Sequence, residues 1–399
     1  MGIVPLEEPR PSSATSQGKI ALLALGFRPF YLLAAAFAAI VIPAWLAIFA
    51  GLLAPPSAIP GLLWHAHEML FGFACAVIAG FLFTAGRAWT GQPTPTGIPL
   101  AMLALLWLAG RLAFIVAPIW IAAPLDFAFL PAVAIALARV LVRAGNKRNY
   151  FAPLLLAALA AANLLVHLRV SGIMGGDPLQ GVIIGLALVT VLETIIGGRI
   201  IPNFTSNGLG GLKIDRNQAL EKAALALSIV ALLAWALGAP GWLVVPGATL
   251  AAALQFARSL SWHPGATLKT PLLWILHLSH GWIVPGLLLI AASELGWVPR
   301  SVAVHALGIG AMAGLIMGMI TRTALGHTGR TLVAGGIETT CYALIHLAVL
   351  ARVLPTLLAP ALYWPGLVLA GVAWSAAFLL YLTRYGPILW RPRIDGKPG

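Results

Sequence analysis

Charged side chains are scarce in this chain. Only 9% of its 399 residues are Asp, Glu, Lys or Arg, whereas ordinary soluble domains contain about 25%. Hydrophobic residues make up 60% of the sequence, so there is too little polar surface to cover a soluble protein of this length. A soluble fold is therefore excluded, and the composition predicts a protein whose solvent is lipid.

Cysteine is also rare. Cys75 and Cys341 both fall inside apolar runs and lack the CxxC, CxxCH or zinc-type spacings, which excludes a disulfide framework, covalently attached haem and an iron–sulfur cluster. We interpret both as small core residues, because free cysteine is usually buried. A signal peptide is missing too, since residues 1–19 mix charges with Pro and Ser and have no cleavage site.

Acidic residues are the scarcer charges. The chain has 11 Asp and Glu against 24 Lys and Arg, a net charge of +13. The basic residues lie singly between apolar runs rather than together on one element, so nucleic acid is excluded as a partner. Basic residues spread in this way are typical of membrane topology.

The apolar runs are long enough to cross a bilayer, which takes about 20 residues. Because helices satisfy their own backbone groups in lipid, the sequence predicts an all-α polytopic membrane protein, a single bundle of twelve transmembrane helices. Gly, Pro and charged residues place the spans at 29–52, 64–85, 98–118, 122–142, 150–169, 179–200, 218–238, 242–258, 270–292, 300–321, 334–353 and 361–384.

The basic residues also predict the orientation. With the N-terminus inside, the inner joints contain all of them except Arg111, Arg169, Arg300 and Arg352. Both termini are therefore expected in the cytoplasm. We expect a polar cytoplasmic tail at 1–19, a twelve-helix transmembrane domain at 20–390 and a second cytoplasmic tail at 391–399.

The stretch WHAHEMLFGF places His65, His67 and Glu68 at the outer mouth of the second span. Ionisable groups at membrane depth indicate a functional site. His305 lies six residues into the tenth span, roughly 9 Å below the same surface, and Arg111 has a similar height. We expect these five residues to form an outer cluster, in which His65 and Glu68 share a helix face because they are three residues apart.

A second cluster is expected nearer the inner surface, where His277 and His327 occur among arginines. His280 lies one turn deeper than His277, and His346 lies at an outer depth in the eleventh span. The arginines at the inner end are Arg28, Arg87, Arg199 and Arg322.

Neutral imidazole is a common ligand of iron and copper, and haem iron takes one or two axial histidines. Haem propionates need a cation when they are buried, which suits Arg111. The competing interpretation is a hydrogen-bonded structural histidine, which we favour for His167 and His263. Our candidate haem or copper ligands are His65, His67, His277 and His305, with His327, His280 and His346 as weaker candidates. The candidates for binding a propionate or for supporting a ligating histidine are Arg111, Glu68, Arg28, Arg87, Arg199 and Arg322.

Several motifs make the chain resemble the NnrS family. They are GFRPF, WHAHEMLFGF, AGFLFTAGRAWTG, LWLAGR, GGRIIPNFT, LLWILHL, HALGIGAMAG and MITRTALGHTGR, in that order over nearly the whole chain. The resemblance implies a multi-pass protein of the bacterial inner membrane that contains non-covalent, b-type haem and copper. It also implies a role in the response to nitric oxide and in protection from nitrosative stress. His280 stands where the family is expected to have an aromatic residue.

The resemblance favours a protein that handles nitric oxide or its metal adducts by binding or by redox turnover. As an enzyme it would be an oxidoreductase of the nitric oxide reductase type, served by a membrane or periplasmic electron donor. Its helices would then be arranged as in the core subunits of haem–copper oxidases, an analogy of fold alone. One alternative is a transporter of a metal, haem or nitrosylated species, although neither related halves nor broken helices are evident. Another is a non-catalytic membrane sensor.

Overall fold

The computed structural model describes residues 20–56 and 58–397, so the tail predicted at 1–19 lies outside the described residues. The fold is all-helical, with 79% helix and no strand in the described part. Twelve helices are long and apolar enough to cross a membrane. The predicted fold class, an all-α polytopic membrane protein with twelve spans, is confirmed.

Several spans consist of more than one helical segment. In chain order the elements are α1 (Phe27–Phe49), α2 (Gly61–His67), η1 (Glu68–Ala74), α3 (Cys75–Thr90), α4 (Gly97–Val116), α5 (Ile119–Arg143), η2 (Lys147–Asn149), α6 (Phe151–Val170), α7 (Leu179–Gly208), α8 (Gln218–Ala236), α9 (Gly241–Leu260), η3 (Pro264–Thr267), α10 (Pro271–Gly281), α11 (Ile283–Glu294), α12 (Arg300–His305), η4 (Ala306–Ala313), α13 (Gly314–His327), α14 (Gly336–Leu358), η5 (Pro360–Leu362) and α15 (Tyr363–Trp390).

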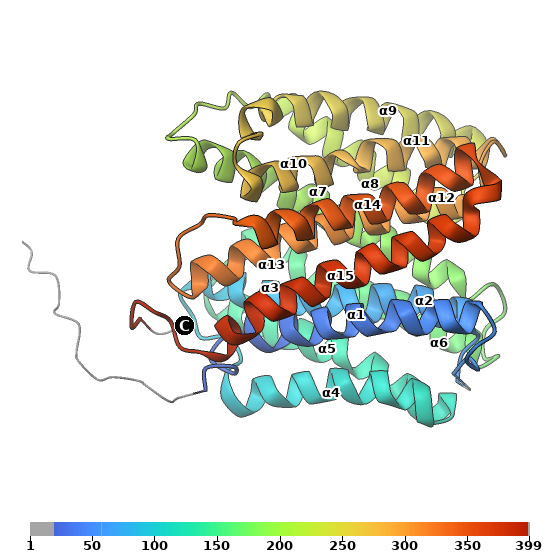
Figure 1. The fold of residues 1–399 in the computed structure, drawn as a ribbon, viewed down its shortest axis with the longest axis horizontal. Helices are drawn as coiled ribbons and strands as arrows, with labels where there is room; N and C mark the ends of the chain where they lie inside the picture. Colours follow the sequence, from blue (N-terminus) through green and yellow to red (C-terminus); the bar gives the residue numbers. More distant parts are fainter. Residues whose placement is uncertain (1–19, 57, 398–399) are drawn as a thin grey trace, which may run out of the picture.

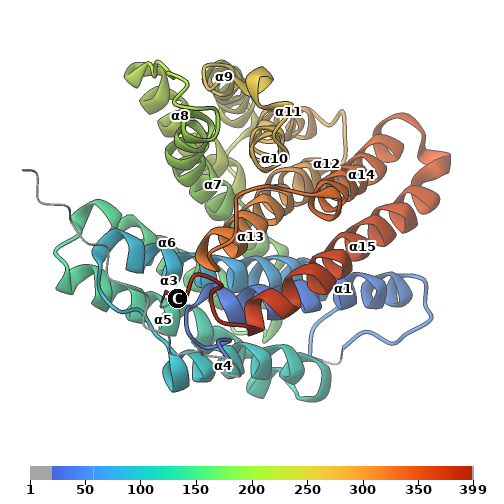
Figure 2. The ribbon, with the colours of Figure 1, turned by 60° about the vertical axis from the view of Figure 1, so that its left-hand side comes forward.

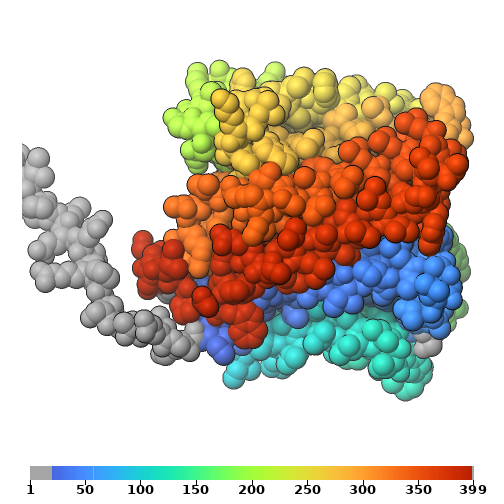
Figure 3. Space-filling view, in the orientation of Figure 1, coloured from blue at the N-terminus to red at the C-terminus, as the bar shows by residue number. Residues whose placement is uncertain are grey.

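The helices lie roughly side by side along the length of the bundle (Figure 1). The start of α1 and the C-terminal segment lie at the same end, which we call the terminal end (Figure 1). The opposite end, where α2 and α12 begin, we call the cavity end. In Figure 3, α14 and α15 (red) cover one face between α1 (blue) and the α9–α11 region (yellow). An even number of spans places both described ends on one side, and its assignment to the cytoplasm stays a prediction.

The second, sixth and tenth spans form the centre of the bundle. Their most apolar windows are 83%, 67% and 72% buried, whereas the other nine range from 33% to 56%. Figure 2 shows α13 among the surrounding lobes formed by α4–α6, by α8, α9 and α11, and by α14 and α15. Close contact needs small residues. At Gly185 of α7, for example, an added Cβ would lie 3.0 Å from the ring of Phe71 in η1.

The central spans continue further than predicted. They end at Thr90, Gly208 and His327, where we expected 85, 200 and 321. The turns beyond the predicted ends contain polar residues and, in α7, Pro202. Hydropathy therefore does not mark where these helices end.

Two of the central spans change from α- to π-helix. In the second span the π segment η1 begins directly after His67, and in the tenth span η4 begins directly after His305. Such π segments often occur at functional sites. The ninth span is interrupted at Trp282, between α10 and α11. Pro285 explains the break, because proline lacks an N–H and its ring clashes with the carbonyl four residues earlier. Our expectation of unbroken spans is wrong there.

Candidate functional site: a histidine cavity and a histidine–aspartate cluster

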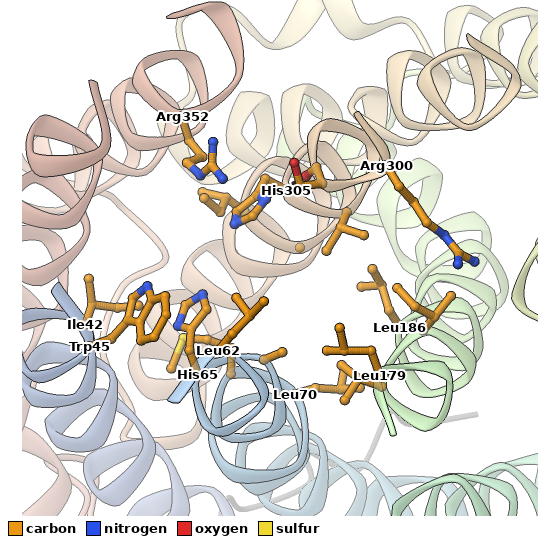
Figure 4. Close-up of a pocket in the computed structure, with 18 of the residues that line it drawn as sticks. Ile42, Trp45, Leu62, His65, Leu70, Leu179, Leu186, Arg300, His305 and Arg352 are labelled. Atoms are coloured by element: carbon orange, nitrogen blue, oxygen red, sulfur yellow. Dashed lines mark hydrogen bonds between the residues drawn. The ribbon is translucent and has the colours of Figure 1, made fainter. Parts of the chain in front are cut away.

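A cavity of about 540 Å³ lies at the cavity end, between α1, α2, α7, α12 and the helices α14 and α15. This volume is within the roughly 300–1,000 Å³ typical of small-molecule and cofactor sites. Its walls are mostly apolar, with Ile42, Trp45 and Leu186 among them. His65 and His305 also line it, from α2 and α12 (Figure 4). We call it the histidine cavity.

His305 has one ring nitrogen in use and one available. Its Nδ1 lies 2.6 Å from the carbonyl oxygen of Ser301, one turn earlier. Since a carbonyl only accepts, Nδ1 carries the hydrogen in a neutral ring, and Nε2 keeps its lone pair. Histidines that bind metals usually have their second ring N–H fixed in this way. His305 is therefore prepared as a ligand.

His65 is held by packing rather than by hydrogen bonding. Its ring stacks on Trp45, with centroids 4.9 Å apart and planes 11° from parallel. Its Nδ1 is buried and finds no hydrogen-bond partner among the described residues. A buried polar atom left unpaired costs about 1–3 kcal/mol. The His65 ring lines the same cavity as His305 (Figure 4).

Two arginines stand beside the cavity, on either side of His305 in Figure 4. Arg352 is buried, donates from Nη1 to Thr356 Oγ1 at 3.0 Å, and lies over the Tyr363 ring. Arg300 is exposed and lies over the Trp235 ring, 4.8 Å from its centroid. Guanidinium groups bind carboxylates well, so this end of the cavity suits an anionic group on an otherwise apolar ligand.

On the other side of α2, three buried residues form what we call the histidine–aspartate cluster: His67, Asp126 of α5 and His167 of α6. Asp126 Oδ2 lies 3.3 Å from His67 Nε2 and 2.8 Å from His167 Nε2. One ligand atom from each residue lies within 4.8 Å of the other two, an arrangement that could hold a metal ion. The structure therefore contains a buried cluster that resembles a metal site.

Three further side chains fix this cluster. Asn163 donates from Nδ2 to Asp126 Oδ2 at 2.8 Å, which turns its Oδ1 toward His67 Nε2 at 2.9 Å. Glu68 Oε1 lies 3.3 Å from His67 Nδ1. Arg111 pairs with Glu68 Oε2 at 2.8 Å and also with Asp126. The cluster and its surroundings thus contain two carboxylates and one guanidinium.

The predicted outer cluster is therefore two sites. His65 and His67 are two residues apart on α2, about 200° around the helix axis. His65 consequently points into the cavity, while His67 points toward α5 and α6. We predicted that Glu68 and His65 share a helix face, but Glu68 contacts His67 and Arg111. A π segment begins at Glu68, so the three-residue spacing of a regular α-helix does not apply.

Sequence reasoning missed Asp126 and Asn163 and treated His167 as structural. Asp126 is an acidic residue inside the apolar fourth span, and that signal could have found it, since such residues are costly in lipid. His167 and Asn163 are four residues apart and so share a face of α6. Their meeting with His67 depends on how three helices pack.

The other histidine candidates lie away from the cavity lining. On α10, His277 Nε2 lies 2.8 Å from Thr205 Oγ1, and His280 Nδ1 lies 3.2 Å from Ser259 Oγ. His327, at the terminal end, packs 5.7 Å from the Phe27 ring. His346 accepts a hydrogen bond from the Trp282 indole at 3.3 Å. Metal binding by these four stays a prediction.

The four inner arginines belong to the terminal end. Arg28 donates to the carbonyls of Leu389 and Arg391 at 2.9 and 2.8 Å. Arg199 donates to Asn149 at 3.0 Å. Arg322 lies 3.9 Å from the Phe204 centroid, and Arg87 is half-buried near the end of α3. None of the four lines the histidine cavity.

The C-terminal segment beyond α15 also binds the terminal end. Arg393 donates to the carbonyl of His327 at 3.1 Å and to the carboxylate of Asp395. The Arg393 hydrogen bonds lower the pKa of Asp395 to about 2. This carboxylate therefore stays ionised at any ordinary pH and helps to orient Arg393.

Fold and site together define a class: a multi-pass, all-helical membrane protein with a buried cluster of histidine and aspartate that resembles a metal site. The comparison with protein families agrees with the motifs. The chain matches the NnrS protein family over residues 21–393 and belongs to that family. No curated protein matches the chain.

Proposed function

We propose that this protein holds haem in the histidine cavity and handles nitric oxide there. The observation that carries the proposal is the pair His65 and His305, which line one apolar cavity from opposite helices. The His305 ring keeps Nε2 for a ligand because its Nδ1 binds the Ser301 carbonyl, and the His65 ring lines the same cavity. Imidazole is a usual axial ligand of haem iron, so the residues present fit this group.

The two histidines would play different parts. His305 is anchored by its hydrogen bond to Ser301 and would hold the haem iron firmly. His65 is held only by stacking on Trp45, so a small molecule can displace it more easily. Bound haem would supply an iron atom that binds nitric oxide. The chain would supply one firm ligand and one exchangeable ligand.

The cations that suit the haem propionates are Arg352 and Arg300, which line the cavity. Arg111, which the sequence indicated for this role, already pairs with Glu68 and Asp126. We therefore propose that Arg111 belongs to the histidine–aspartate cluster and that Arg352 is the principal partner of a propionate, because it is the buried member of the pair.

Membership of the NnrS family and an apolar cavity within the membrane support nitric oxide as the small molecule, since an apolar gas partitions into such a site. We further propose copper as a second cofactor, a location in the bacterial inner membrane and termini in the cytoplasm. Redox turnover would need a membrane or periplasmic electron donor, whereas binding alone would not.

The test is an absorption spectrum of the full-length protein, purified after expression with an ample haem supply. We expect a Soret band that shifts when nitric oxide is added under anaerobic conditions. A protein with no Soret band would contradict the proposal. A Soret band that nitric oxide leaves unchanged would refute the role of the gas while leaving haem binding intact.

A transporter is the second candidate, because the ninth span is broken at Trp282 and broken helices are typical of transporters. Uptake of haem or metal into sealed proteoliposomes distinguishes the two. Flux that persists in His65→Ala and His305→Ala would favour transport. If neither flux nor nitric oxide consumption with an electron donor occurs, a non-catalytic sensor is favoured.

A further inference from the structure

We propose that the histidine–aspartate cluster binds one transition-metal ion of the class that prefers imidazole, with copper as the principal candidate. The ligands are His67, His167 and Asp126, and the site is separate from the histidine cavity. This inference deepens the proposed function by adding a second metal centre, and it can be tested whether or not haem is bound.

The first argument is the spacing of the donor atoms. Nitrogen and oxygen ligands lie about 2.0–2.2 Å from ions such as zinc, so neighbouring ligands of one ion are roughly 2.9–3.4 Å apart in octahedral or tetrahedral geometry. Around Asp126 Oδ2, His167 Nε2 lies at 2.8 Å and His67 Nε2 at 3.3 Å. Small rotations of these side chains suffice to surround an ion.

The second argument is charge. With both imidazoles neutral, the carboxylates of Glu68 and Asp126 have Arg111 as the only cation that contacts them in the described structure. One negative charge is then uncompensated among side chains that are at most 4% exposed. Burying an unpaired charge costs several kcal/mol, so the cluster requires a further cation. A bound metal ion provides it, and a proton is the competing occupant.

The third argument is the support around the ligands. Glu68 Oε1 lies 3.3 Å from the second ring nitrogen of His67, Nδ1, and Asn163 Nδ2 donates to the Asp126 carboxylate. A carboxylate behind a ligating histidine is a usual means of orienting it. His167 has a buried Nδ1 with no hydrogen-bond partner in the described part of the chain, so this ring can rotate to present either nitrogen without losing a second bond.

The cluster also lies close to the histidine cavity. His67 and His65 stand on the same short helix α2, so an ion in the cluster and a ligand in the cavity would lie on two sides of one helical segment. His167 lies in the last turn of α6, at the cavity end. An ion can therefore enter from the same end of the bundle as the cavity.

The experiment uses the full-length, tag-free protein in detergent, stripped of metal and titrated with Cu²⁺. Metal analysis and electron paramagnetic resonance are the readouts. We expect one tightly bound copper per chain, with hyperfine coupling to two imidazole nitrogens. His167→Ala should remove one nitrogen coupling and weaken binding by about tenfold or more, and Asp126→Asn should weaken it by at least a similar factor. His263→Ala is the control, at an exposed histidine outside the cluster that is not a candidate ligand.

Three outcomes would overturn the inference. They are no stoichiometric copper, copper without coupling to two nitrogens, and copper lost equally from His263→Ala. The Soret band, recorded on the same samples, reports separately on the proposed function. Asp126→Asn and His263→Ala must elute as single species in gel filtration, so that lost binding is not lost folding.

Discussion

At the scale of single residues, the histidine cavity and the histidine–aspartate cluster differ in which polar atoms lack a hydrogen-bond partner. At the histidine cavity, His65 keeps an unpartnered Nδ1 and His305 keeps a free Nε2 because Nδ1 binds Ser301. In the histidine–aspartate cluster, almost every polar atom has a partner, and Arg111 connects the two acids. His305 is thus prepared for a ligand, whereas the cluster has two carboxylates and one guanidinium, so its charge balance depends on Arg111.

The variant Arg111→Leu tests whether the guanidinium stabilises the buried carboxylates of Glu68 and Asp126. Removing the guanidinium leaves Glu68 and Asp126 buried without their cation, which should cost about 3–5 kcal/mol of unfolding free energy. The matched control is Arg139→Leu, at an exposed position of the neighbouring helix α5, where a change within about 0.5 kcal/mol is expected. Thermal unfolding in detergent is the measurement. Equal melting temperatures for the two variants would show that Arg111 is not structurally required.

A triple variant distinguishes loss of charge compensation from loss of packing. Adding Glu68→Gln and Asp126→Asn to Arg111→Leu removes the two unpaired charges. If charge is the cause, the triple variant should recover most of the lost stability. If it is no more stable than Arg111→Leu, loss of packing rather than loss of charge explains the defect.

At the residue scale the sequence predicted which groups are unusual but not which of them meet. Depth along the helices placed His65, His67, Glu68, His305 and Arg111 near one surface. Whether two of them touch depends on helix rotation, which sequence spacing does not determine across different helices. Asp126 completes the cluster from α5, and only the packing of α5 against α2 and α6 brings it there.

Among the elements, the π segments η1 and η4 distinguish the second and tenth spans. Hydropathy cannot predict them, because an apolar run has the same hydropathy whether it forms an α-helix or a π-helix. Their positions directly after His67 and His305 suggest that they set the orientation of both histidines. In η4, Gly310 lets Trp282 approach, since an added Cβ would lie 2.5 Å from the Trp282 ring.

Gly310→Ala should therefore destabilise the protein by about 1–3 kcal/mol, the usual cost of overpacking. The control is Gly308→Ala in the same π segment, where an added Cβ meets no atom within 4 Å. We expect that variant to change the unfolding free energy by less than about 1 kcal/mol. Chemical denaturation of both variants is the measurement, and equal effects would contradict the close contact with Trp282.

For the whole molecule, the sequence predicted the number of spans and the structure confirmed it. It did not predict that every fourth span is central. The reason is physical: a lipid-facing helix and a helix surrounded by other helices are both apolar, so composition does not separate them. Burial of the second, sixth and tenth spans follows from packing among all twelve.

The orientation of the whole molecule in the membrane can also be tested. The distribution of basic residues predicts that both termini are cytoplasmic. A green fluorescent protein fused to the C-terminus in a bacterial host should fluoresce, and an alkaline phosphatase fusion at the same point should be inactive. A phosphatase fused in the loop between α1 and α2, near the cavity end, should be active. The reverse pattern would invert the orientation and place the histidine cavity on the inner side.

The central claim is that His305 and His65 are a firm and an exchangeable ligand of one haem. The most direct measurement is the absorption and spin state of the haem in single variants. We predict that the wild-type protein is low-spin, that His65→Ala keeps its haem but becomes high-spin, and that His305→Ala loses most of it. His263→Ala, at an exposed histidine that is not a candidate ligand, should match the wild type. Full retention of low-spin haem in both His65→Ala and His305→Ala would contradict the account.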